Sequence, residues 1–506
     1  MNILKTASIL ICLCVWQLSN SQENSIGDFQ FNKDIGNPKL EGSAIFDDVT
    51  QTYTIKGAGH NIWGQRDEHR FLYNKIVGDF IVTANFRFEG YNEAHRKIGW
   101  MTRATEDDNA VMVGGFIHGD GLTAGQWRER KGADMQNPED DVWAQKRFYE
   151  IIQLERKGNT FIVRAAHSGE PLQEISSKEL PFMPKEAFTG IVIGSHDVDA
   201  VETAKVWNVR IDQPVNETYN PNNEGWIGCR METMNVFDGK RKVILEKDGR
   251  FEAPNWMPDG KELLFNMDGL LYTIPINGGE TKKVNTGSAD QLNNDHCISF
   301  DGKMLGISHN DGNGSNVFVL PITGGEPKAV TTEAPSYLHG WSANNKDVVY
   351  VAKRNGSEVY DIYKKGIKGG KEIKLTNNKK LEHVDGCEYS PDGKYIYYNG
   401  SKNGGTMQLW RMKPDGSNKE QITFDEYNDW FPHISPDGKW IAFISFEPSI
   451  ELNSHPSYKQ VMLRLMPVSG GAPKVIAYLY GGQGTLNVNS WSPDSKHISF
   501  VSNSKK

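Results

Sequence analysis

Four histidines, His296, His339, His383 and His433, recur at nearly the same place in consecutive units of the C-terminal half of the chain. Relative to the turn phrase that follows each one, His296 and His339 share an offset, His433 lies one residue later and His383 lies four residues earlier. If the units surround one axis, these imidazoles converge, and they could bind a divalent metal or act as general base and acid near neutral pH. The four histidines are therefore predicted as catalytic residues. The alternative is that each ring only hydrogen-bonds the neighbouring unit.

Further side chains extend this candidate site. Gln483 lies in a glycine-rich phrase, Tyr480-Gly-Gly-Gln-Gly-Thr485, and Lys459 lies in a sixteen-residue insertion, 445–460, between two strands. Long loops on rigid scaffolds often carry function, although a plain surface excursion is the alternative for this one. Arg354 and Lys459 are candidates for binding a substrate carboxylate. The alternative for Arg354 is a solvated charge on a loop. The predicted metal ligands are His296, His339, His383 and Gln483. The predicted substrate-binding residues are Arg354, Trp430, Lys459 and Asn487.

The repeated units are marked by a turn phrase, in its fullest form Ser390-Pro-Asp-Gly-Lys394, that returns six times at spacings of 42 to 57 residues. Each phrase joins two hydrophobic strands, and a period in this range indicates the blades of a propeller. Six phrases predict six blades. The last phrase is followed by only one strand, so strands at 229–236 and 242–245 are predicted to complete that blade and close the ring.

This pattern resembles the TolB-type six-bladed propeller with WD-like repeats, over residues 228–506. The resemblance implies the fold but not the activity, because this scaffold hosts binding proteins, peptidase partners and lyases alike. The chain has no Gly-x-Ser-x-Gly motif, which weighs against a prolyl-peptidase function.

The N-terminal half predicts a separate all-β domain at 27–212, because segments such as 79–88 and 148–155 alternate apolar and polar residues. The phrase Gly59-His-Asn-Ile-Trp-Gly64 is similar to concanavalin-type jelly rolls found beside sugar-active domains. Residues 213–227 form the predicted linker. The predicted fold class is thus all-β, with an N-terminal jelly-roll sandwich followed by a six-bladed β-propeller.

Residues 1–21 are typical of a secretory signal, with a positive Lys5 and an apolar run too short to span a bilayer. The rest of the chain holds three cysteines, and such a sparse, odd number does not indicate a disulfide framework. A signal segment without a disulfide framework predicts a periplasmic or secreted protein. A net charge of −8 and the absence of a basic cluster argue against a nucleic-acid partner, and no integral membrane segment is expected.

The histidine-bearing propeller also resembles the oligogalacturonate lyases. That resemblance implies a divalent metal, Mn²⁺ or Ca²⁺, that neutralises a uronate carboxylate while a base removes the neighbouring proton. The predicted function is a lyase or dehydratase in polysaccharide degradation that forms an unsaturated uronate from an anionic oligosaccharide. The first alternative is a non-catalytic, TolB-like module that binds glycan or protein. The second places a sugar groove in the jelly roll, lined by His60, Trp63, Arg66, His69 and Trp127.

Overall fold

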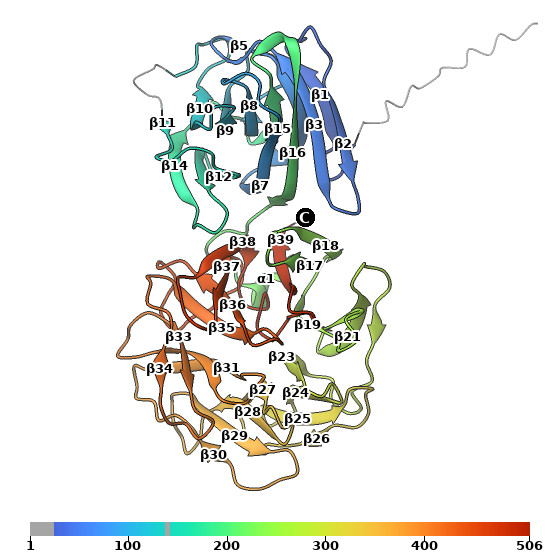
Figure 1. The fold of residues 1–506 in the computed structure, drawn as a ribbon, viewed down its shortest axis with the longest axis vertical. Helices are drawn as coiled ribbons and strands as arrows, with labels where there is room; N and C mark the ends of the chain where they lie inside the picture. Colours follow the sequence, from blue (N-terminus) through green and yellow to red (C-terminus); the bar gives the residue numbers. More distant parts are fainter. Residues whose placement is uncertain (1–24, 137–141, 506) are drawn as a thin grey trace, which may run out of the picture.

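The protein consists almost entirely of β-strands, arranged as a sandwich that lies against the rim of a propeller (Figure 1). The computed structural model describes residues 25–136 and 142–505, so the predicted signal segment lies outside the described residues. The short helix α1 (Pro221–Glu224) lies in the segment between the two domains. No described helix is long and apolar enough to cross a bilayer.

The sandwich contains two seven-stranded antiparallel sheets. In spatial order, the first sheet contains β1 (Phe31–Ile35), β6 (His69–Val77), β15 (Glu186–Gly194), β8 (Lys97–Arg103), β9 (Met112–His118), β10 (Thr123–Arg128) and β11 (Val142–Trp143). The second contains β14 (Gln173–Glu179), β13 (Thr160–Ala166), β12 (Ile151–Lys157), β7 (Phe80–Glu89), β16 (Asp197–Asp212), β3 (Thr52–Gly59) and β2 (Ser43–Asp47). A separate ribbon pairs β4 (Ile62–Trp63) with β5 (Arg66–Asp67).

The strand alternation seen in the sequence places one face of each sheet in a shared core. On β7, Phe80, Val82 and Ala84 are fully buried, and they pack with Leu72 and Trp100 of the first sheet. Side chains on a strand point alternately to opposite faces, so a period of two is enough to build such a core.

The propeller has five four-stranded blades and one composite blade. From the axis outward, the first two blades are β19 (Phe251–Trp256), β20 (Glu262–Met267), β21 (Leu270–Pro275) and β22 (Lys282–Lys283), then β23 (Leu292–Ile298), β24 (Met304–Asn310), β25 (Ser315–Pro321) and β26 (Lys328–Ala329). The next two are β27 (Ser336–Trp341), β28 (Asp347–Ala352), β29 (Asp361–Gly366) and β30 (Ile373–Lys374), then β31 (His383–Tyr389), β32 (Ile396–Ser401), β33 (Gln408–Met412) and β34 (Glu420–Gln421). The fifth is β35 (Asn428–Ile434), β36 (Trp440–Phe446), β37 (Lys459–Pro467) and β38 (Lys474–Gly481).

The turn phrases are tight turns held by their own side chains. In the fourth blade, the Ser390 hydroxyl donates to Asp392 at 2.7 Å, and the same carboxylate oxygen accepts the Lys394 backbone N–H at 3.1 Å. Gly393 has a φ of 68°, which glycine adopts without steric cost. The phrase therefore specifies the turn by local chemistry alone.

The sixth blade closes the ring as the sequence predicts. Strand β17 (Gly228–Asn235) pairs on one side with β18 (Arg241–Lys247) and on the other with β39 (His497–Ser504), from the far end of the chain. An isolated bridge between Trp491 and Ile498 adds the inner edge of this blade. The structure thus confirms the all-β fold class with a six-bladed propeller.

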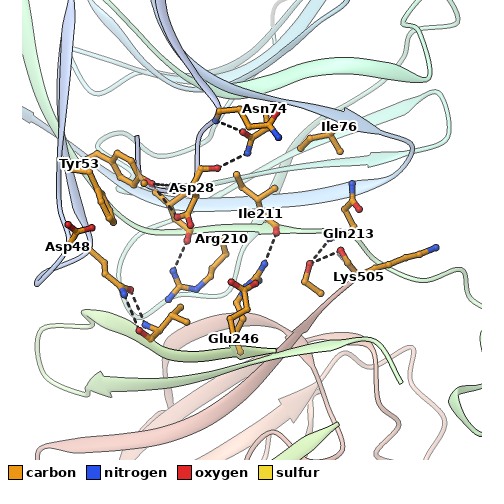
Figure 2. Close-up of a pocket in the computed structure, with 18 of the residues that line it drawn as sticks. Asp28, Asp48, Tyr53, Asn74, Ile76, Arg210, Ile211, Gln213, Glu246 and Lys505 are labelled. Atoms are coloured by element: carbon orange, nitrogen blue, oxygen red, sulfur yellow. Dashed lines mark hydrogen bonds and ion pairs between the residues drawn. The ribbon is translucent and has the colours of Figure 1, made fainter. Parts of the chain in front are cut away.

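The two domains share a buried ion network and a polar cleft. Glu232 of the propeller binds both Arg210 of the sandwich and Arg241 of β18. Beside this network lies a cleft of about 790 Å³ between the domains (Figure 2). Within this cleft, Arg230 forms ion pairs with Glu246, at 3.0 Å, and with Asp212. Its positive charge is therefore already balanced. These contacts fix the sandwich against the propeller.

Candidate functional site at the propeller axis

A pocket of about 340 Å³ lies where the inner strands meet around the axis, and it is called the axial pocket here. Its chemically active lining residues are Asp295, His339, His383, Asp385, His455 and Gln483. Its volume is within the range of about 300–1,000 Å³ that is usual for small-molecule sites. No residue of the described part of the sandwich lines it. The axial pocket therefore belongs to the propeller alone.

Irregular backbone directs these side chains inward. All five complete blades break their pairing register on the inner strand, for example between Leu338 and Gly340 on β27 and between Asp385 and Glu388 on β31. A β-bulge of this kind re-aims a side chain relative to the regular sheet. Because a break of this kind occurs on the inner strand of each complete blade, His339 and Asp385 reach the axis from neighbouring blades.

Asp385 is the electrostatic centre of the axial pocket. Its Oδ1 lies 2.8 Å from Nε2 of His339, and its Oδ2 lies 3.7 Å from Nε2 of His455. Burial alone would raise the pKa of Asp385, but these two imidazoles hold it well below its usual range. Burial likewise opposes the charge on His339, yet the Asp385 carboxylate raises the pKa of His339 above its ordinary value. The pair is therefore held as an ion pair.

His383 and His455 are kept neutral instead. Burial lowers the pKa of both rings, and for His455 this outweighs the opposing effects of Asp385 and the Gln483 side chain. The His455 ring packs edge-on against Trp430, with centroids 4.4 Å apart, and the His383 ring lies 5.6 Å from the same indole. At neutral pH these two imidazoles can accept a proton.

Apart from Nε2 of His339, whose partner is the Asp385 carboxylate 2.8 Å away, three ring nitrogens of the pocket histidines are buried without a hydrogen bond to any described residue. They are Nδ1 of His339, Nε2 of His383 and Nδ1 of His455. Buried polar atoms in native proteins almost always have a partner, so unpaired ones indicate water, an ion or a ligand. Together with the cavity, this feature makes the axial pocket a candidate binding site.

A carboxyl group with a raised pKa completes the axial pocket. Asp295 accepts a hydrogen bond from the Asn293 amide at 2.7 Å, and burial raises its pKa to about 6. A carboxyl group with this pKa is partly protonated near neutral pH and can donate a proton.

The glycine-rich loop and the blade-five insertion form one wall together. The Gln483 backbone N–H donates to the Pro456 carbonyl of the insertion at 3.2 Å, and a Cβ on Gly482 would lie 2.0 Å from that same oxygen. The Asn487 amide donates to the Gln483 side chain at 3.0 Å. Glycine is required at 482 because the two backbones approach so closely. This contact presents Gln483 and Asn487 to the axial pocket.

Not all predicted site residues are in the axial pocket. His339, His383, Gln483 and Asn487 line it, and Trp430 packs behind the histidines. His296 is fully buried elsewhere, where burial lowers its pKa to about 4. His433 contacts Glu388 at 2.8 Å and the Leu486 carbonyl at 3.0 Å, so it bonds the neighbouring blades. The prediction that all four histidines converge is corrected to two.

The two predicted carboxylate-gripping cations also lie outside the axial pocket. Arg354 is buried in blade three and binds Glu372 through its Nε at 2.8 Å, so it is neither a solvated charge nor part of the axial site. Lys459 begins strand β37, pairs with Gly481 and does not line the axial pocket. The cation that does line it is Arg250, which pairs with Glu252 at 2.7 Å.

The sequence indicates that Asp295 and Asp385 lie near this face and that His455 of the insertion could act as an acid or a base, but it does not assign any of the three to a site with the histidines. Asp295 and Asp385 lie on the same inner strands as His296 and His383, close to them in the sequence. Their position before the turn phrase could therefore have indicated them. His455 comes from the insertion, and nothing local indicates that this loop folds back to the axis.

The metal prediction does not fit this arrangement. Over residues 25–136 and 142–505, no three His, Cys, Asp or Glu side chains are placed to hold one ion. Of the five residues considered for a groove in the jelly roll, two are buried: His69 lies against Arg103, and Trp127 is only 6% exposed.

Comparison with known proteins identifies the family. No family model matches the chain. An uncharacterized protein of Agrobacterium fabrum, Atu1656, is 43% identical over 279 residues, which cover 55% of this chain and 93% of the relative. A solved Agrobacterium tumefaciens protein, provisionally described as TolB, is 42% identical over 54% of this chain and 98% of its own, with a TM-score of 0.51. The chain belongs to this family of TolB-like β-propellers, as its sequence resemblance indicates.

Two further matches are more distant. The Tol-Pal system protein TolB of Francisella tularensis is 23% identical over 219 residues, 41% of this chain and 49% of that protein, so the chain spans about half the length of these relatives. An oligogalacturonate lyase from Vibrio parahaemolyticus is a remote neighbour, with 14% identity, a TM-score of 0.34, and coverage of 53% of this chain and 77% of its own. Neither match is close enough to transfer an activity.

Proposed function

We propose that this protein is a secreted or periplasmic enzyme whose axial pocket binds an acidic oligosaccharide and forms an unsaturated uronate by β-elimination. The supporting observation is the meeting of His339, His383 and His455 around Asp385, each ring with a nitrogen that has no described hydrogen-bond partner. The proposed roles follow from opposite pKa shifts: the pKa of His339 is raised and that of His455 is lowered. The reaction needs both a cation and a neutral base, and these two rings can supply them.

His455 is the proposed base. Its Nε2 faces Asp385 and its Nδ1 makes no hydrogen bond to a described residue, so the carboxylate favours the tautomer with a free lone pair on Nδ1. The lowered pKa keeps this ring neutral. The His455 side chain is 26% exposed while its Nδ1 is buried, so the proposal requires that the ring turn when the substrate binds.

His339 and Asp295 supply the other two roles. His339 is protonated beside Asp385, and its Nδ1 can donate to the substrate carboxylate, which stabilises negative charge as C5 loses its proton. In the step itself, the C5 proton moves to Nδ1 of His455, the C5 electron pair forms the C4–C5 double bond, and the C4–O bond breaks. The leaving oxygen takes a proton from the Asp295 carboxyl. These proton transfers use His455 and Asp295 alone.

The test is a change in ultraviolet absorbance from the C4–C5 double bond when the full chain is incubated with a panel of uronic-acid oligosaccharides, with and without EDTA. The expected result is a rise that survives EDTA and falls by a factor of about 10²–10⁴ in His455→Gln, the range for loss of a general base. His497→Gln, on strand β39 outside the axial pocket, is the matched control. A rise abolished by EDTA would contradict the metal-free mechanism.

The alternative is a TolB-like module that binds glycan or protein at the same axial pocket without catalysis. Its supporting observation is membership of the TolB-like family. A flat absorbance trace across the panel, together with saturable oligosaccharide binding that Asp385→Asn weakens, would favour this function and overturn the enzymatic one.

A further inference from the structure

A second hollow opens beside the axial pocket, between blades two and three of the propeller. Its volume is about 430 Å³, within the range of about 300–1,000 Å³ that is usual for small-molecule sites. It is lined by the hydroxyls of two serines and of Tyr337, and by the amides of Gln291, Asn293, Asn310 and Asn313. This hollow is called the amide pocket. Asn293 and Tyr337 line the axial pocket as well, so the two pockets are contiguous.

The walls of the amide pocket are fixed by the fold. One wall is the loop 311–314 between β24 and β25, where the Asn310 side-chain oxygen accepts the backbone N–H groups of Gly312 at 3.1 Å and Gly314 at 3.3 Å. The other wall is the segment that leads into β27. The two walls touch, since a Cβ on Gly314 would lie 2.9 Å from the Cβ of Ala334. The amide pocket therefore has a defined shape before any ligand binds.

The composition of the lining indicates an uncharged, hydroxyl-rich ligand. Among the described residues that line the amide pocket, none is an acid, a lysine, an arginine or a histidine. The side chains of Gln291 and Asn313 are exposed and make no hydrogen bond to a described residue, so each offers both donors and an acceptor. The half-buried Tyr337 ring adds an apolar surface beside its hydroxyl. A neutral sugar unit matches this lining, because it combines hydroxyl groups with apolar C–H faces.

The charges around the amide pocket disfavour an anionic unit. The carboxylates of Asp311 and Glu333 lie next to lining residues in the chain, and both side chains are exposed. Arg354 donates to the Pro335 carbonyl at 3.1 Å, but Glu372 balances its charge at 2.8 Å. A uronate placed here would therefore find no cation in the described lining to pair with its carboxylate.

The amide pocket lies on the side of the axial pocket that holds the proposed acid. The Asn293 side chain donates to the Asp295 carboxylate at 2.7 Å, and its oxygen accepts the Asp295 backbone N–H at 3.0 Å. Burial raises the pKa of Tyr337 and the Asp295 carboxylate raises it further, so these two groups are also close. In the proposed β-elimination, Asp295 protonates the oxygen that leaves from C4. The sugar that carries this oxygen is therefore directed into the amide pocket.

We propose that the amide pocket binds the leaving sugar and that this sugar is uncharged. The inference rests on the proposed function of the axial pocket and narrows its substrate class. The preferred oligosaccharide carries a neutral sugar on O4 of the uronate, as in chains where uronates and neutral sugars alternate. The axial pocket then recognises the acidic unit, and the amide pocket recognises its neutral neighbour. An oligosaccharide of uronates alone would instead place a carboxylate among the amides.

The test compares two tetrasaccharides by isothermal titration calorimetry with the full chain carrying His455→Gln, which prevents consumption of the probe. One probe alternates uronates with neutral hexoses linked to O4 of the uronate, and the other is a tetragalacturonate. The alternating probe should bind at least about fivefold more tightly, which is the effect of one unfavourable charge contact near the surface. In the same background, Gln291→Ala and Asn313→Ala should each weaken its binding by a factor of about 2–10, the range for one lost hydrogen bond.

The matched control is Asn377→Ala, an exposed amide after β30 and outside both pockets, which should leave binding of the alternating probe unchanged. The inference is overturned if the two probes bind equally, if neither binds, or if the Gln291 and Asn313 variants bind as the control does. A flat ultraviolet trace from the parent protein, with the alternating probe still preferred, would refute β-elimination and support the neutral-sugar site.

Discussion

The ion pair between Asp385 and His339 makes a pH-dependent contribution to stability that the variant Asp385→Asn should remove. The two side chains meet at 2.8 Å, with His339 only 4% exposed and Asp385 15% exposed. Asparagine preserves the shape of the residue and can still accept the Gly386 backbone N–H that Asp385 accepts at 2.9 Å. The substitution therefore removes the charge and little else.

The two pKa shifts define the pH window. The raised pKa of His339 means that its contribution is fully present below pH 6.5, its ordinary value, and is lost as pH rises through the folded pKa. The lowered pKa of Asp385 means that its contribution is present above pH 3.8 and is lost as pH falls through the folded pKa. Both contributions are complete between about pH 4 and pH 6.5.

Removing one partner of a buried ion pair costs about 3–5 kcal/mol. Because His339 can lose its proton in the variant, we expect the lower end, about 3 kcal/mol at pH 5.5. The cost should decrease as the pH is raised through the folded pKa of His339, where the parent protein loses the same proton. The measurement is the free energy of unfolding from urea denaturation at pH 5.5 and at pH 9.

The matched control is Asp259→Asn, a carboxylate in an exposed turn, which should change the free energy of unfolding by less than about 0.5 kcal/mol at either pH. A cost for Asp385→Asn below about 1 kcal/mol at pH 5.5 would refute the reasoning, because a buried pair cannot be removed so cheaply. An equal cost at both pH values would show that the titration of His339 is not linked to folding.

Two further changes test the ring closure and the glycine-rich loop. Glu232→Gln should lower the free energy of unfolding by about 3–5 kcal/mol, because Arg210 and Arg241 would keep buried charges without this counter-ion. Guanidinium denaturation measures the change, and a loss below about 1 kcal/mol would contradict the prediction. Gly484→Ala should cost about 1–3 kcal/mol, because φ is +89° there and a Cβ would lie 2.3 Å from the Glu252 carboxylate; an unchanged thermal midpoint would argue against this strain.

Much of the fold was predictable because its signals are local. The turn phrase around Asp392 and Gly393 makes the same hydrogen bonds in the structure that its composition implies, and alternation along 79–88 marks the buried face of β7. The ring closure was also predictable, since the last phrase has one strand after it and an edge must be paired.

The site was only half predictable. Counting offsets from the turn phrase placed His339 and His383 correctly, but the same count grouped them with His296 and His433, whose rings are buried elsewhere. The inner strands contain bulges, so one residue of offset changes the direction of a side chain. Sequence offsets do not reveal where each bulge falls.

The sequence by itself determined the number of blades, the turns between their strands and the alternation that builds the sandwich, because each depends on residues near one another in the chain. Only the tertiary structure decided which polar groups share a site. Asp385 meets a histidine 46 positions before it and another 70 positions after it. Such meetings, and the pKa shifts that follow from them, depend on burial and on distances across blades, which local pattern does not encode.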